Sequence, residues 1–181
     1  MSKKERSIGS VRTLTVAAML TAMSVVIGIF CKNFLNFGNG LFRITFENLP
    51  IIISGVLFGP AVGGAVGAIS DILSYILSTQ SFAISPIVTL GATLVGVVSG
   101  LVSRLMINRG RVPRIALSAA LAHIAGSIIV KSIELYIYYG VAVLYRIPLY
   151  AVIATVEIII ICQLYKNKAF RQLLDNSGDK K

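Results

Sequence analysis

The sequence predicts an all-α integral membrane protein with six transmembrane helices and both termini in the cytoplasm. Of its 181 residues, 56% are hydrophobic and 13% are charged, and the mean hydropathy is +0.85. A soluble domain of this length could not bury so much apolar surface. Several apolar segments also approach the roughly 20 residues that a helix needs to cross a bilayer. We therefore expect one membrane domain, with a six-helix bundle at residues 13–166 between cytoplasmic tails at residues 1–12 and 167–181.

The first predicted span, Leu14 to Phe30, follows a basic tail. Signal peptides share this pattern, but this apolar run is long, and no clear cleavage site followed by a soluble domain is present. We interpret it as a membrane helix. Ala18 and Ala22 lie four residues apart on it, a spacing that lets a second helix approach closely. Internal packing and contact with a partner protein both fit this pair.

Two further helices are predicted on either side of a break at Phe58-Gly59-Pro60. Residues 31–45 mix glycine, asparagine and aromatic residues, which is typical of a packed loop. Glu47 to Leu57 then forms a helix that is too short to cross a bilayer unless it tilts, extends or sits behind other helices. Pro60 to Leu77 forms the third span, because proline is tolerated in a first helical turn.

The remaining spans are predicted at Pro86 to Met106, Ile115 to Tyr138 and Pro148 to Tyr165. Small residues recur at helical spacing on the third and fourth spans, so each should present a narrow face to a neighbour. These residues are Gly63 and Gly67, in line with Asp71, and then Ala92, Gly96 and Gly100.

The positive charges predict the orientation. Of the 17 Lys and Arg residues, four lie in the N-terminal tail, four in or beside the loop after the fourth span, and five in or beside the C-terminal tail. The positive-inside rule makes that side cytoplasmic. A net charge of +10 would suggest nucleic acid in a soluble protein, but here it collects at membrane edges. The other four cations, Lys32, Arg43, Lys131 and Arg146, belong to the outer side.

Four acidic residues lie within or beside spans: Glu47, Asp71, Glu134 and Glu157. A charge inside a membrane costs several kcal/mol unless it is paired or faces water, so each is a functional candidate. Lys131 and Glu134, three residues apart, could simply neutralise each other. Glu157 fits a structural role as well as a functional one.

The charged residues of the outer half could line one cavity that opens to the outside. They are Arg43, Glu47, Asp71, Lys131, Glu134 and Arg146, and the aromatic residues available as walls are Phe42, Phe46, Tyr75, Phe82, Tyr136 and Tyr150. Flat walls with a few placed polar groups are typical of small-molecule sites.

Enzymatic function finds little support. The single histidine, His123, lies in an apolar stretch and fits a packed core residue better than a catalytic base. Cys31 and Cys162 have no metal-like spacing, so we assign no metal and no cofactor. No phosphate-binding glycine loop is present, and neither is a metalloprotease or nucleophile motif. A stand-alone carrier remains an alternative, although no inverted repeat is evident.

Four segments resemble one known family. They are Leu41 to Pro50 (LFRITFENLP), the glycine pattern of Gly55 to Asp71, Ser85 to Gly91 (SPIVTLG), and Arg146-Ile-Pro148 with Val156-Glu157. This chain resembles the substrate-binding S components of energy-coupling factor (ECF) vitamin transporters, over about three quarters of its length. Arg43 to Asn48 and Arg146 to Pro148 are similar to the folate type, and other vitamins, such as riboflavin, pantothenate or thiamine, are the alternative.

The resemblance implies a subunit of the bacterial cytoplasmic membrane that captures a vitamin from outside and has no ATPase activity of its own. The expected partners are a transmembrane scaffold subunit, met through Ala18 and Ala22, and two ATPases. A carboxylate should accept the pterin N–H groups of folate, and cations should hold its glutamate tail. Which carboxylate does so stays open among Asp71, Glu47 and Glu134. The expected ligand-binding residues are Arg43, Phe46, Glu47, Asn48, Asp71, Tyr75, Ser85, Thr89, Lys131, Glu134 and Arg146.

Overall fold

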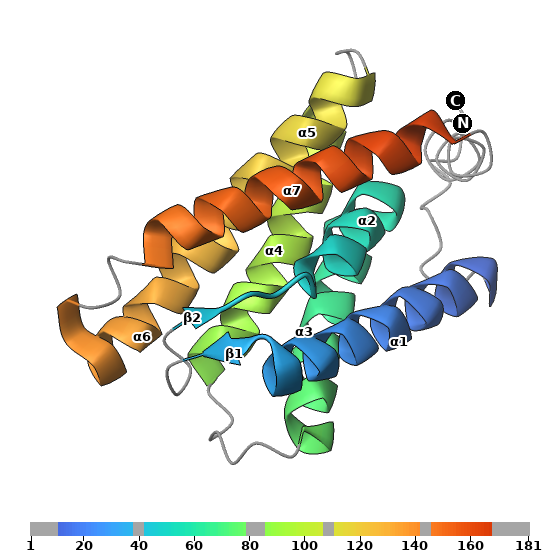
Figure 1. Cartoon of the computed structure of the whole chain (residues 1–181). Helices are drawn as coiled ribbons and strands as arrows, with labels where there is room; N and C mark the ends of the chain where they lie inside the picture. Colours follow the sequence, from blue (N-terminus) through green and yellow to red (C-terminus); the bar gives the residue numbers. More distant parts are fainter. Residues whose placement is uncertain (1–10, 38–41, 79–85, 107–110, 142–145, 168–181) are drawn as a thin grey trace, which may run out of the picture.

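A computed structural model describes residues 11–37, 42–78, 86–106, 111–141 and 146–167. The predicted tails, residues 1–12 and 167–181, lie almost wholly outside this range. The described helices, in chain order, are α1 (Val11–Phe34), α2 (Asn48–Phe58), α3 (Pro60–Leu77), α4 (Pro86–Leu105), α5 (Arg111–Ala122), the π-helix η1 (His123–Val130), α6 (Lys131–Tyr139) and α7 (Arg146–Lys166). They form one bundle (Figure 1).

The six predicted spans are confirmed. Because α5, η1 and α6 follow one another without a gap, they make a single span. Within the described residues, four helical segments are long and apolar enough to cross a membrane: Thr13–Phe34, Pro60–Leu77, Pro86–Leu105 and Val112–Ile133. Two shorter apolar helices, Asn48–Phe58 and Pro148–Leu164, complete the set.

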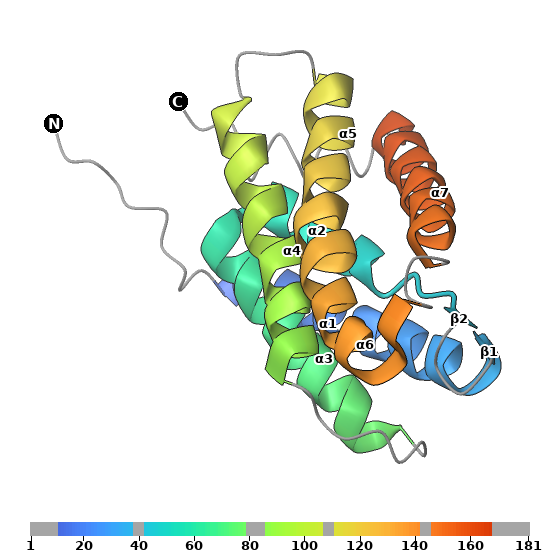
Figure 2. The same ribbon diagram turned by 90° about the vertical axis from the view of Figure 1, so that its left-hand side faces the viewer.

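The predicted loop at residues 31–45 is only partly correct. Helix α1 continues to Phe34, and the chain then forms a small antiparallel ladder between β1 (Asn36–Phe37) and β2 (Phe42–Arg43). Asn36 pairs with Arg43, and Phe37 pairs with Phe42. The ladder lies on the same side of the molecule as α6, and after it the chain continues to the start of α2 (Figure 2).

The predicted break between α2 and α3 is confirmed at Gly59. Its backbone has φ 92° and ψ −178°, a conformation that favours glycine. The Gly59 N–H donates to the Gly55 carbonyl at 2.8 Å and so closes α2, while Pro60 begins α3. A side chain on Gly59 would also collide with the guanidinium of Arg104.

Short helix α2 lies in the middle of the bundle, in contact with α1, α3, α4, α5 and α7. Nine of its eleven residues are buried, and Ile51 and Ile52 are 1% and 0% exposed. A helix enclosed in this way does not need to span the bilayer alone. The sequence left three ways to accommodate the short helix, namely tilting, extension or a place behind other helices, and the structure shows the last. Large apolar side chains such as Met19, Phe30 and Ile76 are instead exposed on the outer helices, where lipid would cover them.

The predicted small-residue faces of α3 and α4 pack against each other. A Cβ built on Gly63 would lie 2.5 Å from the Gly96 carbonyl oxygen, and one on Gly67 or Gly96 would collide with backbone of the opposite helix. The two backbones are therefore in direct contact, and only glycine fits at these positions. We call this contact the glycine seam, defined by Gly63, Gly67, Ala92 and Gly96.

Candidate ligand-binding site

The start of α2 places a charged and an amide side chain inside the bundle. Glu47 immediately precedes α2 and Asn48 is its first residue, and they are 4% and 1% exposed. The Ser24 hydroxyl of α1 donates to the Glu47 backbone carbonyl at 2.7 Å, which fixes the chain as it enters the helix. This anchoring directs both side chains toward the fifth span.

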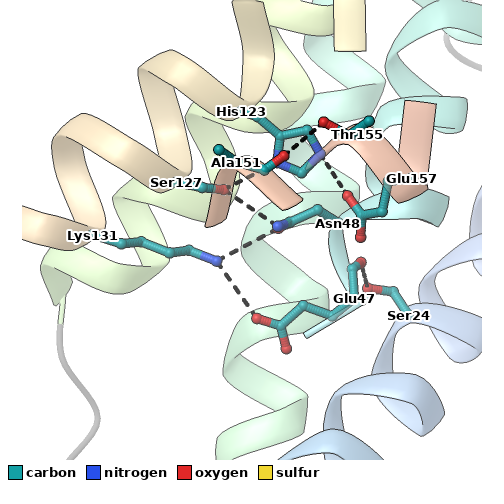
Figure 3. Close-up of polar contacts among 9 residues, drawn as sticks. All are labelled: Ser24, Glu47, Asn48, His123, Ser127, Lys131, Ala151, Thr155 and Glu157. Atoms are coloured by element: carbon teal, nitrogen blue, oxygen red, sulfur yellow. Dashed lines mark hydrogen bonds and ion pairs between the residues drawn. The ribbon is translucent and has the colours of Figure 1, made fainter. Parts of the chain in front are cut away.

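Lys131, at the start of α6, meets both residues. Its Nζ lies 3.5 Å from Glu47 Oε1 and 3.5 Å from Asn48 Oδ1, and the lysine is 3% exposed (Figure 3). Local neutralisation of Lys131 by Glu134, one alternative from the sequence, is not tested, because the side chain of Glu134 lies outside the described residues. A buried ion pair needs further hydrogen bonds to offset desolvation, and Asn48 supplies one.

Asp71 of α3 forms the second acidic part of this site. It is 3% exposed, and the Thr89 hydroxyl of α4 donates to its Oδ2 at 2.8 Å. Glu47, Lys131 and Lys32 are close enough for their charges to interact with the carboxylate of Asp71. Its other oxygen, Oδ1, is buried and has no hydrogen-bond partner among the described residues. A buried acceptor without a donor is rare, and a ligand that donates would satisfy it.

Lys32 joins the site, although we did not predict it there. It is 2% exposed in the last turn of α1, and its Nζ lies 4.0 Å from the centre of the Tyr75 ring. The sequence held a signal for it, because Lys32 is one of the four cations outside the cytoplasmic segments. This buried lysine lies over the face of the Tyr75 ring, and it adds a second cation, besides Lys131, whose charge acts on Asp71.

Gly28 gives α1 a close approach to the same site. A Cβ at this position would lie 2.8 Å from Ser74 Oγ and 2.9 Å from Glu47 Oε2. The carboxylate of Glu47 and the hydroxyl of Ser74 therefore fill the space that a side chain on α1 would take.

Five predicted ligand-binding residues thus come together at one place: Glu47, Asn48, Asp71, Thr89 and Lys131. Phe46 and Tyr75 are half-buried at their positions. Ser85 lies outside the described residues, and so do the side chains of Arg43, Glu134 and Arg146, whose backbones belong to β2, α6 and α7. Among the described residues no group of three or more His, Cys, Asp or Glu side chains could hold a metal ion.

The predicted partner residues Ala18 and Ala22 are exposed on α1. Met19 and Met23 beside them are 67% and 45% exposed, so this face of α1 packs against nothing in the described chain. Internal packing of the alanine pair, the alternative from the sequence, is therefore not seen among the described residues, and contact with a partner stays a prediction.

A second polar group lies deeper in the bundle and was not predicted as a pair. His123 Nε2 of η1 lies 2.5 Å from Glu157 Oε2 of α7, and the two side chains are 2% and 0% exposed. His123 is indeed buried in the core, as its apolar sequence context indicates, but it faces an acid.

Comparison with known proteins gives three results. A family model described as the substrate-specific component of ECF transporters matches residues 12–174. A crystal structure described as FolT bound with folic acid has a TM-score of 0.60 and 20% sequence identity, over 95% of this chain and 96% of that chain. An uncharacterised MG098 homolog of Mycoplasma pneumoniae is 31% identical over 102 residues, and the match covers 56% of this chain but only 20% of that protein.

Proposed function

This chain belongs to the family of substrate-specific components of ECF transporters, and from that premise we propose that it binds folate for uptake across the bacterial cytoplasmic membrane. Both tails would lie in the cytoplasm, and the site at Glu47, Asp71 and Lys131 would open outward. The chain would associate with a scaffold subunit and two ATPases. ATP hydrolysis by these ATPases would supply the energy for transport, because this chain carries no phosphate-binding loop.

The buried carboxylate of Asp71 is the observation that supports folate best. A pterin ring presents an N–H and an amino group side by side, and a carboxylate can accept both. Asp71 Oδ1 is buried with no partner among the described residues, whereas Glu47 already contacts Lys131. We therefore assign pterin binding to Asp71. The fold shared with the folate-bound FolT is consistent with this proposal.

Binding should be tested by titration calorimetry on the purified protein, with folate and riboflavin compared directly. A one-to-one complex with folate, no response to riboflavin and no ATP hydrolysis are the expected results. Mass spectrometry of protein purified from cells grown in rich medium should also find folate. Tight riboflavin binding without a folate response would instead indicate an S component for another vitamin.

The glutamate tail of folate needs a cation, and we assign it to Arg146 at the start of α7. Arg146→Ala should weaken folate binding by about 1.5–3 kcal/mol, the usual range for a hydrogen bond to a charged group. Pteroate, which lacks the glutamate, should be affected far less. Folate and pteroate measured on both proteins form a double-mutant cycle. A coupling energy near zero would make Arg146 an interfacial anchor and move the role to Arg43 or Lys131.

A further inference from the structure

A row of buried polar side chains connects the candidate site with α7. Starting from the site, Lys131 Nζ lies 3.5 Å from Asn48 Oδ1, and Asn48 Nδ2 lies 3.3 Å from Ser127 Oγ (Figure 3). Ser127 Oγ in turn lies 3.5 Å from His123 Nδ1, and His123 Nε2 lies 2.5 Å from Glu157 Oε2. All five residues are at most 3% exposed. A cation stands at one end and a carboxylate at the other.

The chemistry of the donors fixes the direction of the first two contacts. A lysine ammonium can only donate, so the atom of Asn48 that faces it must be the amide oxygen. The amide nitrogen of Asn48 must then face Ser127, and it too can only donate. Ser127 Oγ therefore accepts, and its own proton is free to point at His123 Nδ1.

The tautomer of His123 decides the rest of the row. If Nδ1 is bare and Nε2 carries the proton, Ser127 donates to Nδ1 and the Nε2–H donates to Glu157. The opposite tautomer would give Ser127 two donors and would leave two acceptors, Nε2 and Oε2, facing each other at 2.5 Å. Only the Nε2–H tautomer lets each donor in the row meet an acceptor.

We propose that these five side chains form one directional relay, from the Lys131 ammonium to the Glu157 carboxylate, that couples the ligand site to α7. Among the described residues, His123 Nε2 and both oxygens of Glu157 have no partner with hydrogen-bond geometry, so the 2.5 Å contact between Nε2 and Oε2 is the link that compensates this buried acid. Hydrogen bonds in series polarise one another, and the effect grows when the ends carry opposite charge.

The relay also makes two acids share one lysine. Lys131 contacts Glu47 directly and reaches Glu157 through the relay. A ligand that engages Lys131 or Glu47 alters the first link, and the change passes to the contact between η1 and α7. A π-helix often marks a functional position, and here it carries both Ser127 and His123. In this role Ser127 and His123 are positioning residues, and this part of the inference depends on the proposed function.

The single histidine of the chain allows a test that needs no ligand. Protein labelled with ¹⁵N-histidine should give ring resonances from His123 alone, apart from any purification tag, which must be removed. We expect one bare nitrogen, assigned to Nδ1, and a protonated Nε2. Ser127→Ala should move the Nδ1 resonance, whereas Ser54→Ala should leave it unchanged. Ser54 is a matched control, because it is fully buried and its hydroxyl donates to the Ile51 carbonyl of its own helix. An Nδ1–H tautomer or an imidazolium would overturn the relay.

Folate affinity provides the second test. Ser127→Ala and Glu157→Gln should each weaken folate binding by about 3- to 10-fold, the scale of one hydrogen bond. Ser54→Ala should leave the folate affinity within about 2-fold of wild type. Ser127→Thr, which keeps the hydroxyl, should restore binding. Because both changes act on one relay, the double variant should be little worse than either single variant. Fully additive effects would contradict the relay. Wild-type protein that binds no folate but shows the expected tautomer would reject the proposed function and leave the relay standing.

Discussion

The two halves of this bundle hold their helices together in opposite ways. Helices α3 and α4 meet along the glycine seam, where Gly63, Gly67 and Gly96 have no side chain and the backbones are in contact. The fifth span meets α2 and α7 through apolar residues such as Ile115 and Ile161, and in addition through buried polar side chains, from Lys131 to Glu157. A seam of backbone atoms has one arrangement only. Polar side chains can exchange partners, so the half that bears them is suited to respond to a ligand, and the candidate site lies where the two halves face each other.

The largest effect should follow from filling the glycine seam. Gly63→Leu would push a side chain against the Gly96 carbonyl and the Gly55 Cα, which a Cβ alone would approach to 2.5 and 2.6 Å. Backbone atoms cannot move aside, so we expect a loss of about 3 kcal/mol or more in stability, at the upper end for overpacked cores. Thermal unfolding in detergent measures it.

Ala65→Leu is the matched control, because Ala65 lies two residues away on the exposed face of α3. It should melt within a few degrees of wild type. If Gly63→Leu melted at the same temperature, the seam would not be the rigid half of the molecule.

The exposed face of α1 belongs to neither half, and changing it separates binding from transport. Ala18→Trp or Ala22→Trp should abolish folate uptake into cells, because a bulky side chain prevents close approach of a partner helix. Folate binding to the purified protein should change by less than about 2-fold, since both alanines point away from the bundle. Joint loss of binding and uptake would show that this face serves the fold instead.

Removing the charge of Asp71 tests the candidate site, which lies where the two halves face each other. Asp71→Asn keeps the size of the side chain but replaces one acceptor oxygen with a donor. We expect folate to bind more weakly by about 1.5–3 kcal/mol, the range for hydrogen bonds to a charged group. Thr89→Val, which removes only the hydroxyl that donates to Asp71, should cost less. Calorimetry on both variants ranks them, and equal losses would mean that Asp71 acts through Thr89 alone.

The glycine half of this comparison could be predicted from the sequence, and the polar half only in part. Gly59 and Pro60 mark the helix break, and the spacing of Gly63, Gly67 and Gly96 marks the packed faces, because each signal is local. The distribution of Lys and Arg placed Lys131 and Glu47 on the same side of the membrane. It could not identify their contact, which joins residues 84 positions apart.

Other features of the polar half depend on tertiary structure. The π-helix at His123 has the same apolar composition as an ordinary helix, so nothing local distinguishes it. The His123 and Glu157 contact requires the relative position of two spans, and the burial of Lys32 requires the Tyr75 ring of a different helix. A pattern along one chain contains no such distances.

The smallest effect should come from a glycine on the polar side. Gly28 of α1, like Gly63 of α3, lies within a helix, but the atoms that a Cβ would meet are the ends of flexible side chains, Ser74 Oγ at 2.8 Å and Glu47 Oε2 at 2.9 Å. These atoms can move by a few tenths of an ångström. Gly28→Ala should therefore leave the stability within about 1 kcal/mol, helped by the better helix propensity of alanine.

Folate affinity should nevertheless fall, by about 2- to 5-fold, because Glu47 is displaced from Lys131. Ser74→Gly in the same protein should restore it by vacating the space that the new methyl group needs. Calorimetry and thermal unfolding on Gly28→Ala, with and without Ser74→Gly, provide the measurement. A loss of stability as large as that of Gly63→Leu would mean that the polar side is as rigid as the seam, and the difference between the two halves would then lie only in their chemistry.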